Sequence, residues 1–349
     1  MRRNFQHITI AGAFLLGAAL LQACTMRQLY TLEPAKTLVT FAVDWSAFPD
    51  DVSGMTATFH EESPDSGVSR FETNRVDSFH VKILPGDYRL WLMNQSEHEF
   101  WTLEFSGLES DPFAKAKNYG AAPSWYEGTQ RVVLEPEALG IATYGFSIDD
   151  ADVPREFVPF TKATTLDLGD PLVTLHPFNV VSSLQVRVYF TNIEYVRGVR
   201  GCIDGLAGGW HILPASPSDE RVAEILADWT LVKDPDDATR GFVELVEPLS
   251  TFGRAEGSGG ADAEDSVLYL WVLLADNSTV LQYAFPVGDR YTCVPDDLGR
   301  VRLELSVTIG DGTLEGPIEI PDVIPADGGG GFLPNVIDWE EGETIVMPV

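Results

Sequence analysis

The chain has 349 residues, of which 44% are hydrophobic, and its formal net charge at pH 7 is −30. The hydrophobic content is typical of a folded chain with a sizeable core and excludes an intrinsically disordered protein. The strong negative charge argues against nucleic acid and anionic lipid headgroups as ligands, because both would be repelled.

The N-terminal segment predicts export and lipid attachment. Two arginines precede an apolar run over residues 8–21, which has the length of a signal-peptide core and is too short to cross a membrane. The run ends in Leu-Gln-Ala-Cys at residues 21–24, which resembles the bacterial lipobox, although Gln22 departs from the small or aliphatic residue usual there. The resemblance implies that residues 1–23 are a lipoprotein signal peptide. It also implies that Cys24 becomes acylated, with palmitate-type chains that hold the protein in a membrane. The alternative is an ordinary signal peptide followed by a free cysteine.

After a tether over residues 24–37, the sequence predicts an antiparallel β-sandwich over residues 38–150. Its segments are short, rich in β-branched and aromatic residues, and bounded by Pro, Gly, Asp and Ser, which is typical of strands. They cover residues 38–45, 55–60, 78–84, 88–94, 102–107, 130–136 and 142–148. Several short strands without intervening helices favour a sandwich over an α/β fold.

An acidic stretch with several prolines, residues 151–171, is predicted to link this sandwich to a second one over residues 172–349. Residues 266–287 predict a hairpin that turns at residues 275–278. One short helix is expected over residues 218–229, with Ser218 as its N-cap. Further strands are expected within 173–193, over 300–309, and in a closing hairpin over 336–349 that turns at Glu341-Gly342.

A turn in the first half carries a family resemblance. In VKILPGDYRLWLMNQS (residues 81–96), Pro85 fixes φ, Gly86 permits an unusual φ, and Tyr88 points inward from the strand that follows. The pattern is similar to the LPxGxY turn of transthyretin-like sandwiches. Together with residues 39–61 it resembles the N-terminal domain of fimbrillin-like lipoproteins from anaerobic Gram-negative bacteria.

The second half adds to this resemblance. GCIDGLAGGW (residues 201–210) is similar to a Gly-Ala-rich segment of those proteins, and residues 336–349 are similar to their terminal hairpin. The resemblance implies an all-β chain of two transthyretin-like or Greek-key β-sandwich domains in tandem. It also implies an outer-membrane lipoprotein that serves as the anchor or accessory subunit of a fimbrium and in cell adhesion. Its partners would be membrane lipid, through acylated Cys24, and fimbrial subunits or other envelope proteins, through β-strand pairing.

Two matters stay open at this point. The sequence does not choose between the periplasmic and the outer face of the membrane. Because Val349 directly follows the last expected strand, we expect an anchor or terminal subunit rather than a stalk subunit.

The sequence predicts no catalytic residue, metal ligand or cofactor, and hence no enzyme. None of the histidines forms a His-x-His or His-Glu-x-x-His pattern, so no single element carries metal-ligand spacing. Acidic turns explain SEHEF (residues 96–100) and DPDDATRG (residues 234–241) more simply than ligand sites do. GLAGG (residues 205–209) lacks the lysine of a phosphate-binding loop.

Two residue pairs are candidate sites. Trp125 and Trp210 lie in loops and could stack on a sugar, which supports an alternative function as a surface glycan-binding lipoprotein of a nutrient uptake system. Packing against the end of a sandwich is the competing role for both. Cys202 and Cys293 could form a disulfide in an oxidising compartment, or each could be a small buried residue.

Overall fold

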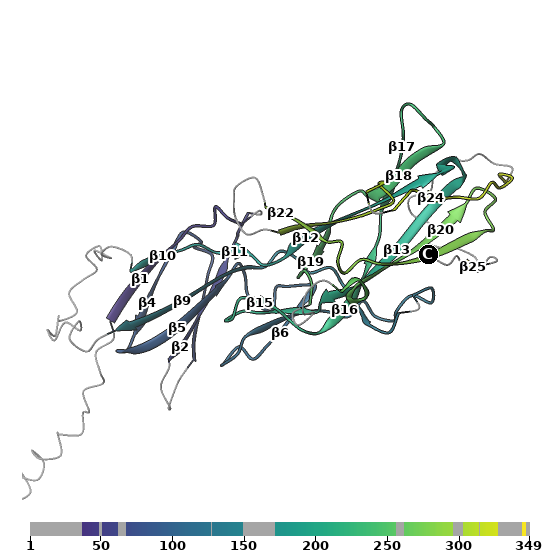
Figure 1. Cartoon of the computed structure of the whole chain (residues 1–349). Coiled ribbons are helices and arrows are strands. Elements are labelled where there is room, and N and C mark those ends of the chain that lie inside the picture. Colours follow the sequence, from purple (N-terminus) through teal and green to yellow (C-terminus); the bar gives the residue numbers. More distant parts are fainter. Residues whose placement is uncertain are drawn as a thin grey trace, which may run out of the picture.

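The structure, a computed structural model, describes residues 37–48, 51–61, 68–126, 128–148, 172–255, 262–295, 303–313, 315–326 and 344–346. Across these residues, strands in five sheets make up the protein, and the helical elements are short 3₁₀ turns such as η3 (Ile193–Tyr195) and η4 (Ala263–Asp265) (Figure 1). The predicted all-β fold is confirmed. No helix in the described ranges has the length and hydrophobicity needed to cross a membrane.

Two sheets pack face to face in the N-terminal half. The first has the order β10-β1-β4; its strands are β10 (Val173–Leu175), β1 (Thr37–Val43) and β4 (Ser78–Ile83). The second has the order β11-β9-β5-β2-β3; its strands are β11 (Phe178–Asn179), β9 (Gly140–Ile148), β5 (Gly86–Met93), β2 (Met55–Glu61) and β3 (Val68–Thr73). Aromatic rings fill the space between them, with Phe41 stacked on Phe79 and in contact with Phe59.

The Pro-Gly turn carries the chain from one of these sheets to the other. β4 ends at Ile83 in the first sheet and β5 begins at Gly86 in the second. The Tyr88 side chain is buried, and its hydroxyl donates a hydrogen bond to the carbonyl of Leu84 at 2.9 Å. The predicted inward position of Tyr88 is therefore confirmed.

Strand β5 belongs to two hydrophobic cores at once. Leu90 and Leu92 are buried in the N-terminal core, whereas Trp91 and Met93 are buried in a larger core that extends through the second half. Successive side chains of a strand point to opposite faces. The uninterrupted apolar run at residues 90–93 therefore packs both parts of the molecule against one strand.

The second half contains two larger sheets and a small one. The seven-stranded sheet has the order β17-β18-β12-β23-β22, with β19 and β24 also paired to β12. Its strands are β17 (Trp229–Lys233), β18 (Arg240–Leu245), β12 (Ser182–Thr191), β23 (Leu303–Ile309), β22 (Thr292–Pro295), β19 (Leu249–Thr251) and β24 (Ile318–Glu319). The predicted alternation in β12 is confirmed, because Leu184, Val186, Val188 and Phe190 are all buried.

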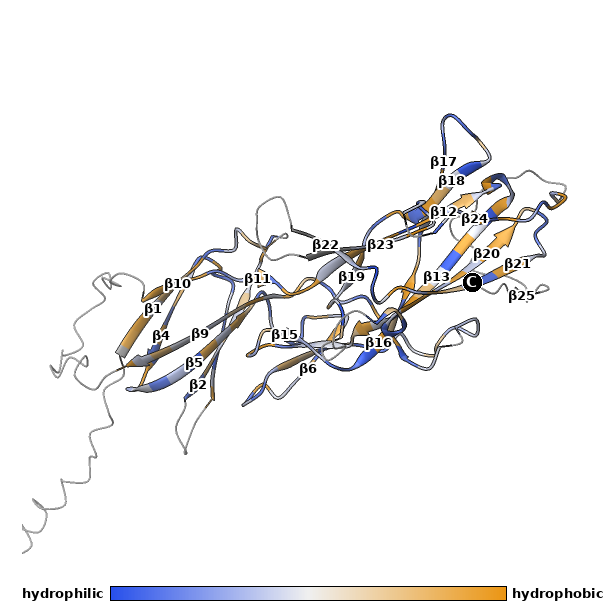
Figure 2. Cartoon of the chain, in the orientation of Figure 1, coloured by the Kyte–Doolittle hydropathy of each residue, from blue (hydrophilic) through white to orange (hydrophobic). Residues whose placement is uncertain are grey.

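The six-stranded sheet has the order β25-β21-β20-β13-β16-β8. Its strands are β25 (Thr344–Val346), β21 (Val280–Pro286), β20 (Val267–Leu274), β13 (Val196–Ala207), β16 (Arg221–Leu226) and β8 (Arg131–Val133). The small sheet, β15-β14-β7-β6, contains β15 (Ser216–Pro217), β14 (Gly209–His211), β7 (Phe113–Ala116) and β6 (Leu103–Ser106). Hydrophobic residues dominate β1 and β20, as Figure 2 shows.

Hydrogen bonds join the two halves of the sequence. β8 pairs with β16 in the six-stranded sheet and β7 pairs with β14 in the small sheet, so strands from residues 113–133 bond to strands beyond residue 200. In the opposite direction, β10 and β11 join the N-terminal sheets. The predicted linker at residues 151–171 lies outside the described residues, and the two-domain division stays a prediction.

The predicted helix over residues 218–229 is wrong. Residues 221–226 form β16, which pairs with β13 on one side and with β8 on the other. Val222, Ile225 and Trp229 have helical spacing, but a central strand buried on both faces also carries a continuous apolar run. Ser218 caps no helix, and its backbone N–H donates instead to the carbonyl of Gly209.

The predicted hairpin over residues 266–287 is confirmed, since β20 and β21 pair in antiparallel register around a turn at residues 275–279. The Asp276 carboxylate accepts hydrogen bonds from the backbone N–H groups of Ser278 and Thr279. Near the chain end, β25 pairs in parallel with β21. The turn predicted at Glu341-Gly342 lies outside the described residues.

Candidate functional site

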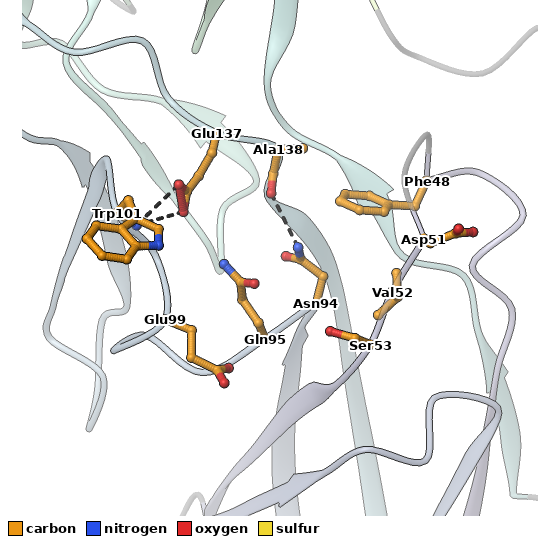
Figure 3. A pocket seen from close by; sticks show the side chains of 10 residues that line it. All are labelled: Phe48, Asp51, Val52, Ser53, Asn94, Gln95, Glu99, Trp101, Glu137 and Ala138. Carbon is orange, nitrogen blue, oxygen red and sulfur yellow. Dashed lines mark hydrogen bonds between the residues drawn. The ribbon is translucent and has the colours of Figure 1, made fainter.

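Three loops enclose an open pocket of about 330 Å³ beside the small sheet. Phe48 and residues 51–53 come from between β1 and β2, four residues come from the β5–β6 loop, and Glu137 and Ala138 come from the β8–β9 loop (Figure 3). The lining side chains are those of Phe48, Asp51, Val52, Ser53, Asn94, Gln95, Glu99, Trp101, Glu137 and Ala138.

Trp101 is the dominant aromatic group at this pocket and is 85% exposed to solvent. The neighbouring Phe100 and Leu103 are both buried in the large core. Because the chain must turn these two side chains inward, Trp101 is held facing outward at the start of β6.

Hydrogen bonds fix the Trp101 backbone on both sides. Its N–H donates to the carboxylate of Glu137, at 2.8 Å to Oε1 and 3.2 Å to Oε2 (Figure 3). The Lys117 ammonium donates to the carbonyl oxygens of Phe100 at 3.0 Å and Trp101 at 2.7 Å. The Glu137 N–H donates in turn to Oγ1 of Thr102 at 2.9 Å. The indole is therefore presented on a rigid support.

Asn94 joins two of the three loops. Its Nδ2 donates to the carbonyl of Ala138 at 3.3 Å, and its Oδ1 accepts from the N–H of Gly140 at 3.0 Å. A side chain at Gly140 would collide with the rings of Trp45 and Phe48, because an added Cβ would lie 2.8–2.9 Å from them. Glycine at this position thus allows Phe48 to form one wall of the pocket.

The pocket offers groups that can bind a ligand. Its residues offer an aromatic face, the carboxylates of Asp51, Glu99 and Glu137, the Gln95 amide and the Ser53 hydroxyl. The lining contains neither histidine nor cysteine. In the described part of the chain, no group of three His, Cys, Asp or Glu side chains could hold a metal ion.

Trp125, one of the two predicted stacking residues, covers the outer face of the six-stranded sheet. It is half-buried, its ring lies 4.6 Å from that of Trp271, and the Arg200 guanidinium lies 4.8 Å from its centroid. Burial lowers the pKa of Arg200 to about 10. The neighbouring Tyr126 is buried in the same cluster.

The predicted loop position of Trp210 is wrong, because this residue lies on strand β14, which pairs with β7 and β15. The ring is half-buried and packs against the large core. The structure does not bring Trp125 and Trp210 into one site, and a ligand-stacking role for either residue stays a prediction.

The predicted cysteine roles also stay predictions. Cys202 is a free, buried thiol on β13 of the six-stranded sheet, whereas Cys293 lies on β22 of the seven-stranded sheet. The Cys293 side chain and the whole of Cys24 lie outside what the structure describes.

Two carboxyl groups are buried in the six-stranded sheet, away from the pocket. Glu224 is 1% exposed, and its burial raises its pKa well above the ordinary value, with a further contribution from the charge of Glu135. Burial also raises the pKa of Asp204, although its carboxylate accepts a hydrogen bond from the Val267 N–H at 2.7 Å. Both carboxyl groups are buried and neither lines the pocket.

Trp101 was the residue that sequence reasoning missed. It is one of eight tryptophans, and its position next to Phe100 did not distinguish it. The usable signal is the local order Phe100-Trp101-Thr102-Leu103, in which two core residues flank the tryptophan. That pattern predicts an exposed Trp101 only once the path of the loop is known.

Comparison with solved structures shows which known fold this chain is similar to. A candidate adhesin from Bacteroides ovatus is 16% identical, with a TM-score of 0.51 over 86% of this chain and 97% of that one. This likeness shows the fold. A candidate adhesin from Bacteroides thetaiotaomicron is 11% identical over 68% of this chain and 77% of that one, with a TM-score of 0.43. The fimbrial anchor protein Mfa2 from Porphyromonas gingivalis is 10% identical over 67% of this chain and 77% of that one, with a TM-score of 0.37.

The neighbour that shows the fold is a candidate adhesin. The sequence profile of the domain of unknown function DUF5119 matches residues 23–227. This is more than half of the chain, so the protein belongs to the DUF5119 family. A comparison with curated protein sequences found no match.

Proposed function

We propose that this protein is a non-enzymatic, lipid-anchored structural protein of the cell envelope. It is the anchor or an accessory subunit of a fimbrillin-type pilus and joins other subunits by β-strand pairing. The observation that carries the proposal is a lipobox-like sequence at residues 21–24 ahead of an all-β chain. The fold of that chain matches a candidate adhesin over 97% of the latter's length.

The seven-stranded sheet offers an edge suited to strand pairing. β17 is the terminal strand of this sheet among the described residues, on a hairpin that projects from the second half of the molecule (Figure 1). The Asp234 N–H donates to the Arg240 carbonyl, and the Val246 N–H donates to the Asp228 carbonyl. Backbone groups alternate between the two sides of an antiparallel strand. Those of Leu231 therefore face the outer edge.

The outer edge of β17 carries little of the charge that usually protects an edge strand. Leu231 and Val232 are half-buried apolar residues, and Lys233 is the charged residue at the strand end. The edge strand β3 contrasts with it, because Arg70 and Glu72 form an ion pair there at 2.8 Å. Charged side chains hinder pairing at an edge, which favours β17 over β3 as the contact strand.

Replacing Cys24 with Ala tests the anchor. We expect the wild-type protein to sediment with membranes and to incorporate labelled palmitate, whereas the variant is released and carries no label. Continued membrane attachment of the variant would contradict acylation as the anchor.

Replacing Leu231 with Pro tests strand pairing, with Leu231→Ala as the matched control. Both variants lose the leucine side chain, but only proline removes the outward N–H, and an edge strand tolerates proline there. Fimbrial subunits that co-purify with the wild type should be retained by the alanine variant and lost by the proline variant. Equal recovery of those subunits with both folded variants would rule out the β17 edge as the contact.

A further inference from the structure

The exposure of Trp101 differs from that of every other tryptophan that the structure describes. Trp91, Trp229 and Trp271 are buried in the core, and the others are half-buried, whereas Trp101 is 85% exposed. Single exposed apolar residues are common on protein surfaces, so exposure alone assigns no role. The surroundings of Trp101 supply the further observations.

The first observation is the rigidity of the support. The Trp101 N–H is held by Glu137 and its carbonyl by Lys117, and Asn94 ties the same loop to the β8–β9 loop. An aromatic ring with a fixed backbone loses little conformational entropy when a ligand stacks on it.

The second observation is the polar pocket next to the indole. Among the described residues, no hydrogen bond joins the Gln95 amide or the Ser53 hydroxyl to another protein group. The amide provides both donors and an acceptor, and the hydroxyl provides one of each. Exposed carboxylates of Asp51 and Glu99 add acceptors at the rim. The volume of about 330 Å³ is at the lower end of the range for small-molecule sites.

We propose that Trp101 and this pocket bind a neutral saccharide. The apolar C–H face of a pyranose ring packs on the indole, while its hydroxyl groups donate to the carboxylates and exchange hydrogen bonds with Gln95 and Ser53. The carboxylates of Asp51, Glu99 and Glu137 repel acidic sugars, so the site selects neutral ones. The inference does not depend on lipid anchoring or on strand pairing.

A cationic peptide side chain is the competing ligand, because an ammonium group is attracted to an indole face and to carboxylates. One feature favours the saccharide. The Gln95 amide and Ser53 hydroxyl match the mixed donor and acceptor character of sugar hydroxyls, which an ammonium group lacks.

The test uses the purified full chain in detergent, applied to an array of neutral and acidic oligosaccharides. Isothermal titration with the best neutral oligosaccharide and with trilysine follows. We expect binding to neutral saccharides alone, weakened tenfold or more by Trp101→Ala and several-fold by Gln95→Ala. Trp101→Phe, which keeps an aromatic face, should restore part of the affinity.

The matched control is Tyr119→Ala, which removes a second exposed aromatic ring, one outside the pocket lining, and should leave the affinity unchanged. Full binding by Trp101→Ala, or no binding to any neutral saccharide on the array, would overturn the proposal. Trilysine binding that depends on Trp101, without saccharide binding, would overturn it in favour of a cationic peptide partner.

Discussion

The Trp125 loop and the Trp101 loop use the same residue type for opposite purposes. Trp125 lies against Trp271 and Arg200 and covers a sheet, and its neighbour Tyr126 is buried in the same cluster. Trp101 stands in solvent on a fixed backbone, beside carboxylates that are open to solvent. The Trp125 loop contributes to the stability of the fold, whereas the Trp101 loop leaves its indole available to a ligand. The difference comes from the segments against which each loop packs.

The largest expected difference between the Trp125 and Trp101 loops is the loss of stability when Trp125 is replaced with Ala. Truncation of a buried aromatic residue costs about 3–5 kcal/mol. Because Trp125 is half-buried, we expect the unfolding free energy to fall by about 2 kcal/mol, as measured by urea denaturation. The Trp125→Phe variant should lose less. A decrease in unfolding free energy below about 0.5 kcal/mol would be that of an ordinary surface residue. It would contradict the claim that Trp125, unlike Trp101, stabilises the fold.

A smaller effect concerns Glu224. Burial raises the pKa of its carboxyl above the ordinary value of 4.5, so the folded state binds this proton more tightly than the unfolded state does. The stabilisation is fully present below about pH 4.5 and is lost as the pH rises through the raised pKa. Glu224→Gln cannot ionise, so its stability relative to the wild type should increase with pH.

Thermal unfolding at pH 5 and pH 8 measures the Glu224 effect. A tenfold difference in proton affinity corresponds to about 1.4 kcal/mol of unfolding free energy, and we expect a gain of that order at pH 8. Asp204 also has a raised pKa, so the variant should keep part of the pH dependence. Equal stability differences at the two pH values would contradict a buried, protonated Glu224.

The smallest expected effect is that of Trp101→Ala on stability. Surface substitutions usually change the unfolding free energy by less than about 0.5 kcal/mol, and the hydrogen bonds at Trp101 involve its backbone, which alanine retains. Urea denaturation should therefore give the same midpoint for variant and wild type. A loss comparable to that of Trp125→Ala would assign Trp101 to the fold instead.

Local pattern predicted much of this fold. The alternation at Leu184, Val186 and Val188 gave β12, and the turn at residues 275–278 gave the β20–β21 hairpin. The segment at residues 218–229 shows where pattern fails, because its helical spacing is also compatible with a strand buried on both faces. The pairing of β8 with β16 joins residues about 90 positions apart, and no local pattern encodes it.

The candidate site was less predictable than the fold. The sequence predicted loop positions for Trp125 and Trp210. It contained no information on which of the two rings packs against the face of a sheet. Trp101 is exposed because Phe100 and Leu103 enter the core and because Glu137, from a distant loop, binds its backbone. Both causes depend on contacts between segments that are far apart in the sequence.

Fluorine NMR of the protein labelled with 5-fluorotryptophan tests most directly the claim that Trp101 serves binding and Trp125 serves the fold. Trp101→Phe and Trp125→Phe assign the two resonances. On titration with a neutral oligosaccharide that binds on the array, the Trp101 resonance should shift in proportion to the bound fraction while the Trp125 resonance stays in place. A shift of the Trp125 resonance with an unchanged Trp101 resonance would contradict the account.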